Sequence, residues 1–384
     1  MSRIDSLIAK SRSQGVEFRR LGDVISLNFG TRITKLQNSG TLYPVYGGGG
    51  ESFRTDSFNR ENEYVVSRFA MSEVCVRKVT GKFWMLDSGF TFDTVNDSVN
   101  KHYVAYWLLN NQQRVYECSS QGAQKNLKTQ EFKKFLVPIP PLEVQHEIVR
   151  ILDQFTQLET EVEAELDARR RQYAFYRDSL LASVDAPRVV MGDLGTFMRG
   201  RRFTKNDVVA SGIPSIHYGE IYTDYGVSAS RAIREVRSDM VGQLRFAQPR
   251  DVIFAGVGET VEDVGKAVAW LGDEPVAVHD DTFSFTSNLN PKYVAYAVQT
   301  NDFHAQKANH VARGKVKRLS ATGLAKIKIP VPGEEEQARI VSILDKFDAL
   351  LNDVRAGLPA ELAARRKQYE YYRDKLLTFE ESAT

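Results

Sequence analysis

The feature that most constrains this chain is a long segment that occurs twice. Residues 137–181 and 329–377 both begin with two alternating prolines, and both end in the pattern Arg-Arg-x-Gln-Tyr-x-x-Tyr-Arg-Asp-x-Leu-Leu. Proline fixes φ and has no N–H to donate, so each pair of prolines ends the element before it. The long charged segments that follow predict a tandem order of globular domain, helix, globular domain and helix.

The first copy has apolar side chains at heptad spacing, which is typical of a helix that packs against another helix. Leu152 and Leu166 occupy one heptad position, and Phe155 and Val162 occupy the other. The rest of the segment is too charged to be buried on all sides. We therefore expect a coiled-coil helix over residues 138–183, roughly 60 Å long at 1.5 Å per residue. A solvated single helix is the alternative.

The second copy continues this pattern over residues 330–380. It is four residues longer than the first, and the insertion includes Gly357 and Pro359. Such an insertion locally unwinds a coiled coil, and proline kinks a helix, so we expect a kink or break at 357–359. The residues that we expect to pair the two helices are Leu152, Phe155, Val162, Leu166, Tyr173, Tyr176, Leu344, Phe347, Leu351, Leu362, Tyr369 and Tyr372.

The segments outside the long helices also repeat. Leu-Gly-Asp-Val at 21–24 matches Met-Gly-Asp-Leu at 191–194. Strand-like runs separated by turn signals predict mixed α/β domains over 16–137 and 184–329. A short amphipathic helix is expected within residues 1–15.

Local patterns within the first domain are specific enough to test. We expect strands at 63–67, 74–78 and 132–137, a turn at 47–50 and a helix at 101–111. Because the first long helix ends where the second domain begins, the two helices can pair only if they run antiparallel. The predicted fold class is therefore α/β, with two mixed domains separated by an antiparallel coiled coil and related by an approximate two-fold axis.

Composition excludes several classes of protein. With 384 residues, 42% hydrophobic and 26% charged, the chain has the composition of ordinary globular proteins. Its two cysteines, Cys75 and Cys118, can form no disulfide framework, and neither has metal-ligand spacing. No apolar stretch is long enough to span a membrane, so we expect a cytoplasmic protein.

Several short motifs resemble those of enzymes, but each lacks residues that the catalytic motif requires. Residues 254–258 resemble the glycine turn that holds S-adenosylmethionine in methyltransferases, but the Asn-Pro-Pro-aromatic motif is absent. There is no phosphate-binding Gly-Lys-Ser/Thr sequence. His279-Asp280-Asp281 could bind a metal, although acidic turns without a metal are commoner. We therefore expect no catalytic residue, no metal site and no cofactor bound by this chain.

Two loops in each domain carry side chains suited to DNA, although solvated loops are the alternative. Arginine and lysine bind guanine and phosphate, and asparagine and glutamine bind adenine. The loop after Gly30 and its counterpart after Gly200 are basic. The loop at 119–128 is rich in amides, whereas its counterpart at 313–318 is basic. The candidates are Arg32, Thr34, Lys35, Gln121, Gln124, Lys125, Asn126, Lys128, Arg199, Arg201, Arg202, Lys205, Arg313, Lys315, Lys317 and Arg318.

The openings of the long segments at 139–153 and 329–345, their shared endings and the Leu-Gly-Asp-Val at 21–24 carry a resemblance to a known family. Over nearly its whole length, the chain resembles the specificity subunits of Type I restriction–modification enzymes. The resemblance implies that each domain reads one half of a bipartite, asymmetric site in double-stranded DNA. It also implies that the helices bind two adenine-N6 methyltransferase subunits.

The resemblance further implies that restriction subunits join this complex. S-adenosylmethionine, ATP and Mg²⁺ are then expected on the partner subunits and not on this chain. A specificity subunit of a Type IIB-like enzyme is the nearest alternative. A coiled-coil scaffold that does not bind DNA is an alternative from a different class.

Overall fold

The computed structural model describes residues 16–314, 316–352 and 357–379. The helix expected within residues 1–15 and the candidate Lys315 lie outside the described residues, as do the side chains of Arg313 and Leu351. The chain forms two compact units. Unit 1 comprises the described parts of Met1–Glu161 and Leu362–Thr384, and unit 2 comprises those of Val162–Glu361.

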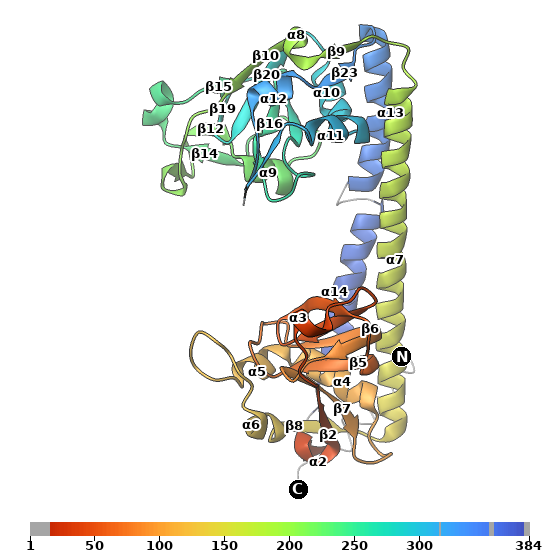
Figure 1. The fold of residues 1–384 in the computed structure, drawn as a ribbon. Coiled ribbons are helices and arrows are strands. Elements are labelled where there is room, and N and C mark those ends of the chain that lie inside the picture. Colours follow the sequence, from red (N-terminus) through yellow and green to blue (C-terminus); the bar gives the residue numbers. More distant parts are fainter. Residues whose placement is uncertain (1–15, 315, 353–356, 380–384) are drawn as a thin grey trace. The chain divides into compact units, whose positions relative to one another are not determined.

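Unit 1 is built on a six-stranded sheet (Figure 1). In sheet order its strands are β2 (Ile25–Phe29), β7 (Gly89–Thr94), β5 (Arg60–Ser67), β6 (Val76–Met85), β3 (Tyr43–Gly47) and β4 (Gly50–Thr55). Strands β3 and β6 are parallel, and the other neighbours are antiparallel. A separate antiparallel pair is formed by β1 (Glu17–Arg20) and β8 (Leu136–Ile139). The short helices are α2 (Leu21–Val24), α3 (Lys35–Asn38), α4 (Lys101–Asn110), α5 (Gln112–Glu117) and α6 (Thr129–Lys133).

The local predictions for unit 1 hold in part. The expected helix at 101–111 is α4, and the expected turn at 47–50 joins β3 to β4. The strand expected at 132–137 is wrong in its first half, because Phe132 and Lys133 end helix α6. Phe132 is fully buried there against Phe90, so packing of the aromatic ring outweighs the local strand pattern. The strand expected at 74–78 begins only at Val76.

Unit 2 contains two five-stranded sheets (Figure 1). The first has the order β10 (Gly195–Arg199), β20 (Thr282–Ser287), β16 (Val252–Ala255), β18 (Ala267–Trp270) and β13 (Ser228–Ala229). The second has the order β11 (Val208–Val209), β14 (Arg234–Val236), β12 (Ile213–Ile216), β19 (Val276–Val278) and β15 (Phe246–Ala247). A third sheet joins β17 (Val257–Gly258), β22 (Lys317–Leu319) and β21 (Val311–Arg313), and β9 (Arg188–Val190) pairs with β23 (Lys328–Pro330).

The helices of unit 2 are short, apart from the long ones described below. They are α8 (Met191–Leu194), α9 (Tyr218–Thr223), α10 (Pro291–Ala297), α11 (Asn301–Lys307), α12 (Ala321–Ala325) and the 3₁₀ helices η1 (Lys205–Asp207) and η2 (Ser238–Gln243). Helix α10 begins at an Asn290 cap, whose side chain accepts hydrogen bonds from two backbone N–H groups. Helix α4 of unit 1 begins in the same way at Asn100. Helices α4 and α10 therefore begin with the same kind of asparagine cap, and each packs against strands of the sheet in its own unit.

The long helices begin after the proline pairs. Helix α7 (Leu142–Ala182) is continuous, whereas the second copy forms α13 (Glu334–Asn352) and α14 (Gly357–Leu377). The residues between α13 and α14 lie outside the described range. Pro359 lies in the first turn of α14, where a missing N–H removes no intrahelical hydrogen bond. No helix in the described ranges is long and apolar enough to cross a membrane.

Within unit 1, helix α7 packs antiparallel against α14. The rings of Phe155 and Tyr372 stack with centroids 5.4 Å apart, and Leu152 is fully buried. One turn further along α7, Glu159 forms an ion pair with Arg366 at 2.7 Å. Partner numbers fall as α7 numbers rise, as antiparallel pairing requires. Glu159, which interrupts the apolar heptad pattern, therefore lies opposite a cation on the neighbouring helix.

Within unit 2, helix α7 packs against α13. Tyr173 is buried and lies 6.4 Å from Phe347 between ring centroids. Tyr176 stacks on the same Phe347 at 6.2 Å but is 48% exposed. The expected pairing residues Leu166 and Leu344 are buried. The predicted fold class, two mixed α/β domains with antiparallel long helices, is confirmed.

Three further expected pairing residues are only partly buried. Val162 and Leu362 are half-buried, and Tyr369 is half-buried against the core of unit 1. The partial exposure of these side chains agrees with a two-helix seam, which leaves its edges in contact with water.

Substitutions at Tyr173 test the packing of helix α7 against α13. Its hydroxyl is buried without a hydrogen-bond partner in the described part of the chain, and burial raises its pKa. Replacing it with phenylalanine should leave the free energy of unfolding unchanged or raise it, since no hydrogen bond is lost. Replacing it with glutamate should lower that free energy by about 3 kcal/mol, because the carboxylate would be buried near Asp345 and Asp348. Urea unfolding measures both, and a Glu variant as stable as the parent would contradict this packing.

Candidate nucleic-acid interface

The basic loop of unit 2 follows strand β10, whose last residue is Arg199. Strand β10 pairs with β20, and the backbone bonds continue beyond it: Gly200 N–H donates to Thr282 O at 3.1 Å, and Arg201 N–H donates to Val278 O at 2.9 Å. A Cβ at Gly200 would lie 2.1 Å from the oxygen of Val278, so only glycine fits. These contacts fix the basic loop against the β19–β20 turn.

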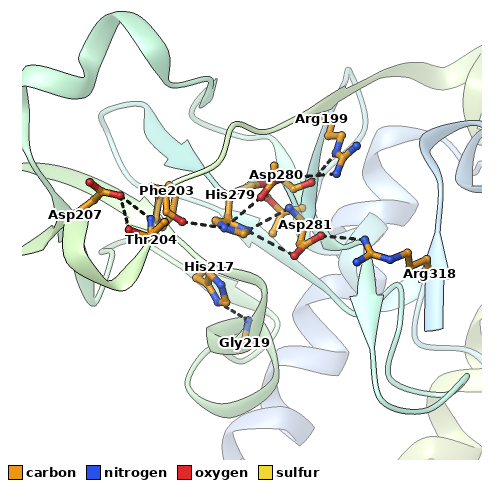
Figure 2. A network of polar contacts seen from close by, with 11 residues as sticks. Arg199, Phe203, Thr204, Asp207, His217, Gly219, His279, Asp280, Asp281 and Arg318 are labelled. Atoms are coloured by element: carbon orange, nitrogen blue, oxygen red, sulfur yellow. Dashed lines mark hydrogen bonds and ion pairs between the residues drawn. The ribbon is translucent and has the colours of Figure 1, made fainter. Parts of the chain in front are cut away.

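The β19–β20 turn contains His279, Asp280 and Asp281, and it is held by the histidine (Figure 2). His279 is buried, and its Nδ1 accepts a hydrogen bond from Asp281 N–H at 3.2 Å. Its Nε2 lies 3.1 Å from the carbonyl oxygen of Phe203. The acceptor role of Nδ1 assigns the proton to Nε2, which donates to that carbonyl. The imidazole thus joins the turn to the basic loop.

These contacts bear on the metal interpretation of the turn. Ligand atoms of His279, Asp280 and Asp281 all lie within 4.8 Å of one another. Both ring nitrogens of the histidine are engaged by the backbone, however, and each carboxylate faces an arginine. A histidine must present a free nitrogen lone pair to bind a metal. The contacts of the turn thus orient side chains, and binding of an ion through His279 would have to break at least one of these hydrogen bonds.

The turn brings together two arginines from distant parts of the chain. Arg318, on strand β22, places Nη1 3.3 Å from a carboxylate oxygen of Asp281. Arg199 donates from Nε to the backbone oxygen of Asp280 at 2.6 Å, with Nη2 3.8 Å from its carboxylate. Figure 2 shows both guanidinium groups reaching toward the turn. Arg199, next to the loop after Gly200, and Arg318, from the segment 313–318, thus come together at the β19–β20 turn.

A pocket of about 230 Å³ lies at this meeting point. Its lining includes Arg199, Arg318, both aspartates of the turn and the backbone of Gly256. The wall of this pocket thus carries two arginines and two aspartates. Outside the pocket, burial and the neighbouring His279 lower the pKa of His217 to about 4, so this second histidine is neutral at pH 7.

The other basic residues of unit 2 are placed differently. Arg201, Arg202 and Lys205 are exposed, and in the described ranges none of their side chains has a hydrogen bond or ion pair. Lys317 is half-buried and donates from Nζ to the oxygen of Gly314 at 2.9 Å. Arg199 and Arg318 are thus held by carboxylates, whereas Arg201, Arg202 and Lys205 extend into solvent.

The basic loop of unit 1 is anchored by equivalent bonds. Gly30 N–H donates to Gly89 O at 3.2 Å, and Thr31 N–H donates to Met85 O at 2.9 Å. Arg32, Thr34 and Lys35 follow and are exposed. The side chain of Thr34 is bonded to Gln37, on helix α3, at 3.2 Å.

The amide-rich loop of unit 1 is anchored next to the basic one. Leu127 N–H donates to Arg68 O at 2.8 Å, and Met71 N–H donates to Lys125 O at 3.0 Å. In unit 2, Leu319 N–H donates to Gly256 O at 2.9 Å, which is the same bond in the second copy.

The side chains of this loop have different surroundings. Asn126 accepts from Ala70 N–H through Oδ1 at 3.3 Å, so its carbonyl oxygen supports the loop. Gln121, Gln124 and Lys128 are exposed, and Lys125 is half-buried. The exposed amides keep their donors and acceptors available to a ligand.

Two features escaped the sequence-based search. Arg68 stacks over Phe29 and Phe69, with its guanidinium carbon 4.9 Å and 4.5 Å from the two ring centroids, and lies between the two candidate loops of unit 1. Asp280 and Asp281 contact Arg199 and Arg318, whereas the sequence pattern indicates them only as possible metal ligands. Arg68 makes the same backbone bonds in unit 1 as Gly256 makes in unit 2, but no local sequence pattern marks Arg68 as a neighbour of Phe29.

Comparison with known proteins shows which family this chain belongs to. The family model described as "Type I restriction modification DNA specificity domain" matches residues 13–168 and again residues 189–364. The chain is 28% identical to a putative type I restriction enzyme specificity subunit of Haemophilus influenzae, over 95% of this chain and 96% of that protein. It is 32% identical to the EcoR124I/EcoR124II specificity subunit of Escherichia coli, over 73% of this chain and 72% of that subunit.

The fold has solved counterparts. A crystal structure of the type I restriction–modification S subunit from M. genitalium superposes with a TM-score of 0.54 at 17% identity, covering 96% of this chain and 97% of the other. At this identity the likeness concerns the fold alone. The two matches of one family model, on the two units that share one set of backbone anchors, establish that this chain belongs to the type I restriction–modification DNA specificity family.

Proposed function

We propose that this chain is the DNA-reading subunit of a type I restriction–modification complex, and that each unit reads one half of a bipartite, asymmetric site. The observation that carries this is the pair of loops in each unit. Equivalent backbone bonds anchor them after Gly30 and Gly200 and before Leu127 and Leu319, yet the side chains on them differ. A common frame with different side chains suits two readers of different half-sites.

The chemistry of these loops fits double-stranded DNA. Arginine makes bidentate bonds to guanine, and glutamine does so to adenine, each worth about 1–3 kcal/mol of discrimination. Exposed cations such as Arg32 and Arg202 suit phosphates, which set affinity and orientation. Unit 1 thus offers amides with flanking cations, and unit 2 offers mainly arginines.

We propose that the chain itself is not catalytic. S-adenosylmethionine, ATP and Mg²⁺ would bind to partner subunits, and the complex would act on DNA in the cytoplasm. The family membership supports this division of labour, because its description names DNA specificity.

Two exposed aromatic residues support the binding of two methyltransferase subunits. Phe175 on α7 is 67% exposed, and Tyr371 on α14, its counterpart in the repeat, is 61% exposed. Each makes an edge contact with the next residue along, Tyr176 or Tyr372. Exposed aromatics at equivalent places suit two copies of one partner.

The surroundings of Phe175 suit a protein surface. It lines a pocket of about 550 Å³ in unit 2 together with Arg171, Arg188 and Asp302. Protein interfaces typically combine an aromatic anchor with a polar rim around it. We propose that adenine-N6 methyltransferase subunits bind at Phe175 and at Tyr371, and that restriction subunits join this complex.

Changing the exposed aromatics tests the partner proposal. Phe175→Glu should weaken binding of one methyltransferase subunit, and the double variant with Tyr371→Glu should abolish assembly at micromolar concentration, since hot-spot residues contribute about 2 kcal/mol or more each. Analytical ultracentrifugation with the methyltransferase measures the stoichiometry. Val241→Glu, at another exposed apolar position (59% exposed), is the matched control. Unchanged assembly of the double variant would rule out these anchors, and methyl transfer by the purified chain alone would contradict the non-catalytic role.

The loops are tested one unit at a time. Arg32→Ala should weaken the recognition of one half-site and Arg202→Ala that of the other, each with a smaller salt dependence of DNA binding because a phosphate contact is lost. DNA titrations with one half-site scrambled at a time assign each effect. If both variants bind all these duplexes with the parent affinity and salt slope, the assignment of the loops is wrong.

A further inference from the structure

Arg199 and Arg318, the two arginines at the β19–β20 turn, are paired with carboxylates, unlike the candidate cations Arg201, Arg202 and Lys205, for which the described residues offer no such partner. The side chains of Arg199 and Arg318 remain open to solvent, at 55% and 59% exposed. Exposed ion pairs contribute little to stability, a median of about 0–1 kcal/mol. Folding alone therefore gives a weak reason for two such pairs at one turn.

The aspartates argue against a simple phosphate-binding role for these arginines. A carboxylate beside a guanidinium cancels much of its charge and repels a phosphate. It also restrains the rotamers of the arginine, which lowers the entropy lost when a ligand is bound. Restrained arginines with partly cancelled charge suit a target recognised by geometry, and the guanine O6/N7 edge is the base edge that an arginine fork matches.

The turn that carries the carboxylates is itself well fixed. His279 bonds to both the turn and the basic loop, and Gly256 N–H donates to Asp281 O at 2.8 Å. Thr282 adds a hydroxyl bond to the backbone oxygen of His279 at 2.7 Å. A fixed turn gives each carboxylate a defined position from which to orient its arginine.

Unit 1 has the same frame without the arginine pair. Phe29 ends β2 as Arg199 ends β10, and Asn126 precedes Leu127 as Arg318 precedes Leu319. Ser88 stands in the place of Asp281, since it accepts the equivalent backbone bond from Arg68 N–H at 2.8 Å. The arginine–aspartate arrangement is thus a property of unit 2 and not of the shared frame.

We propose that Asp280 and Asp281 are specificity-determining positioning residues, which hold Arg199 and Arg318 for the recognition of guanine in the half-site of unit 2. This inference rests on the proposed function. Arg201, Arg202 and Lys205, which have no such partners in the described residues, would then contact phosphates.

The experiment uses the complex assembled with its methyltransferase, and it measures methylation of duplexes in which each position of one half-site is randomised in turn. Asp281→Asn removes the ion pair and a negative charge while keeping the shape of the side chain. Non-specific DNA affinity should rise, because repulsion of phosphate falls, whereas the preference for guanine at one position should fall by about tenfold. Asp281→Glu should restore part of this preference.

Arg318→Lys keeps the positive charge but loses the two parallel donors of the guanidinium group. This variant tests the same inference if an aspartate variant does not fold. It should lose preference at the same position as Asp281→Asn while keeping most of the affinity. The control Arg202→Ala should weaken binding but leave the base preference at every position of the half-site unchanged. A thermal melt checks that each variant is folded.

The possible outcomes separate this inference from the proposal on which it rests. Loss of guanine preference at a shared position in Asp281→Asn and Arg318→Lys supports the inference. If the parent complex methylates a bipartite motif but both variants keep its base preferences, the positioning role is overturned while the proposed function stands. If Asp281→Asn raises affinity with unchanged preferences, the carboxylate acts only through charge, and the inference is again overturned. A parent complex without sequence preference would overturn the proposed function itself.

Discussion

Each α/β unit is fixed to its long helix by a tyrosine hydroxyl that donates to an aspartate on that helix. Tyr106 on α4 bonds to Asp153 on α7 at 2.6 Å, and Tyr296 on α10 bonds to Asp345 on α13 at 2.7 Å. Both rings are buried, and burial together with the bond raises the pKa of each hydroxyl. A hydrogen bond to a charged group contributes about 1.5–3 kcal/mol. The sheet of each unit, and so the candidate DNA-binding loops that it carries, is oriented against the helix through this bond.

A second pair of bonds repeats beside the first. Tyr103 donates to Pro138 O and Tyr293 to Pro330 O, both at 2.9 Å, so the strand before each long helix is held as well. Repetition of these bonds explains how the two copies keep one frame although their interiors differ. The loops lie on this frame, where a changed side chain alters the surface without disturbing the core. Arg318 in unit 2 and Asn126 in unit 1 are the clearest example.

Much of this frame could be predicted from sequence because it is periodic or duplicated. The heptads gave the pairing of Phe155 with the second helix copy, and the repeat gave the antiparallel order. The tyrosine–aspartate bonds could not be found in that way, since their partners are 47 and 49 residues apart and no local pattern joins them. Helix α6 was missed because the burial of Phe132 outweighs its local preference for a strand.

The candidate site also has a part that could be predicted from sequence and a part that could not. Residue types and loop positions indicated which segments carry the cations, and Arg199 and Arg318 were among them. Their meeting at Asp280 and Asp281 depends on the pairing of β17 with β22 and on the hydrogen bonds of His279, which are tertiary contacts. For the same reason the sequence could not separate carboxylate-held arginines from Arg202, which lies in open solvent.

Two units on one frame should read two different half-sites. Methylome sequencing of a host that carries this chain with its methyltransferase measures the motif that is read. We expect methylated adenines in one bipartite, asymmetric motif whose halves are separated by a gap of fixed length. A continuous motif, or two identical halves, would contradict it.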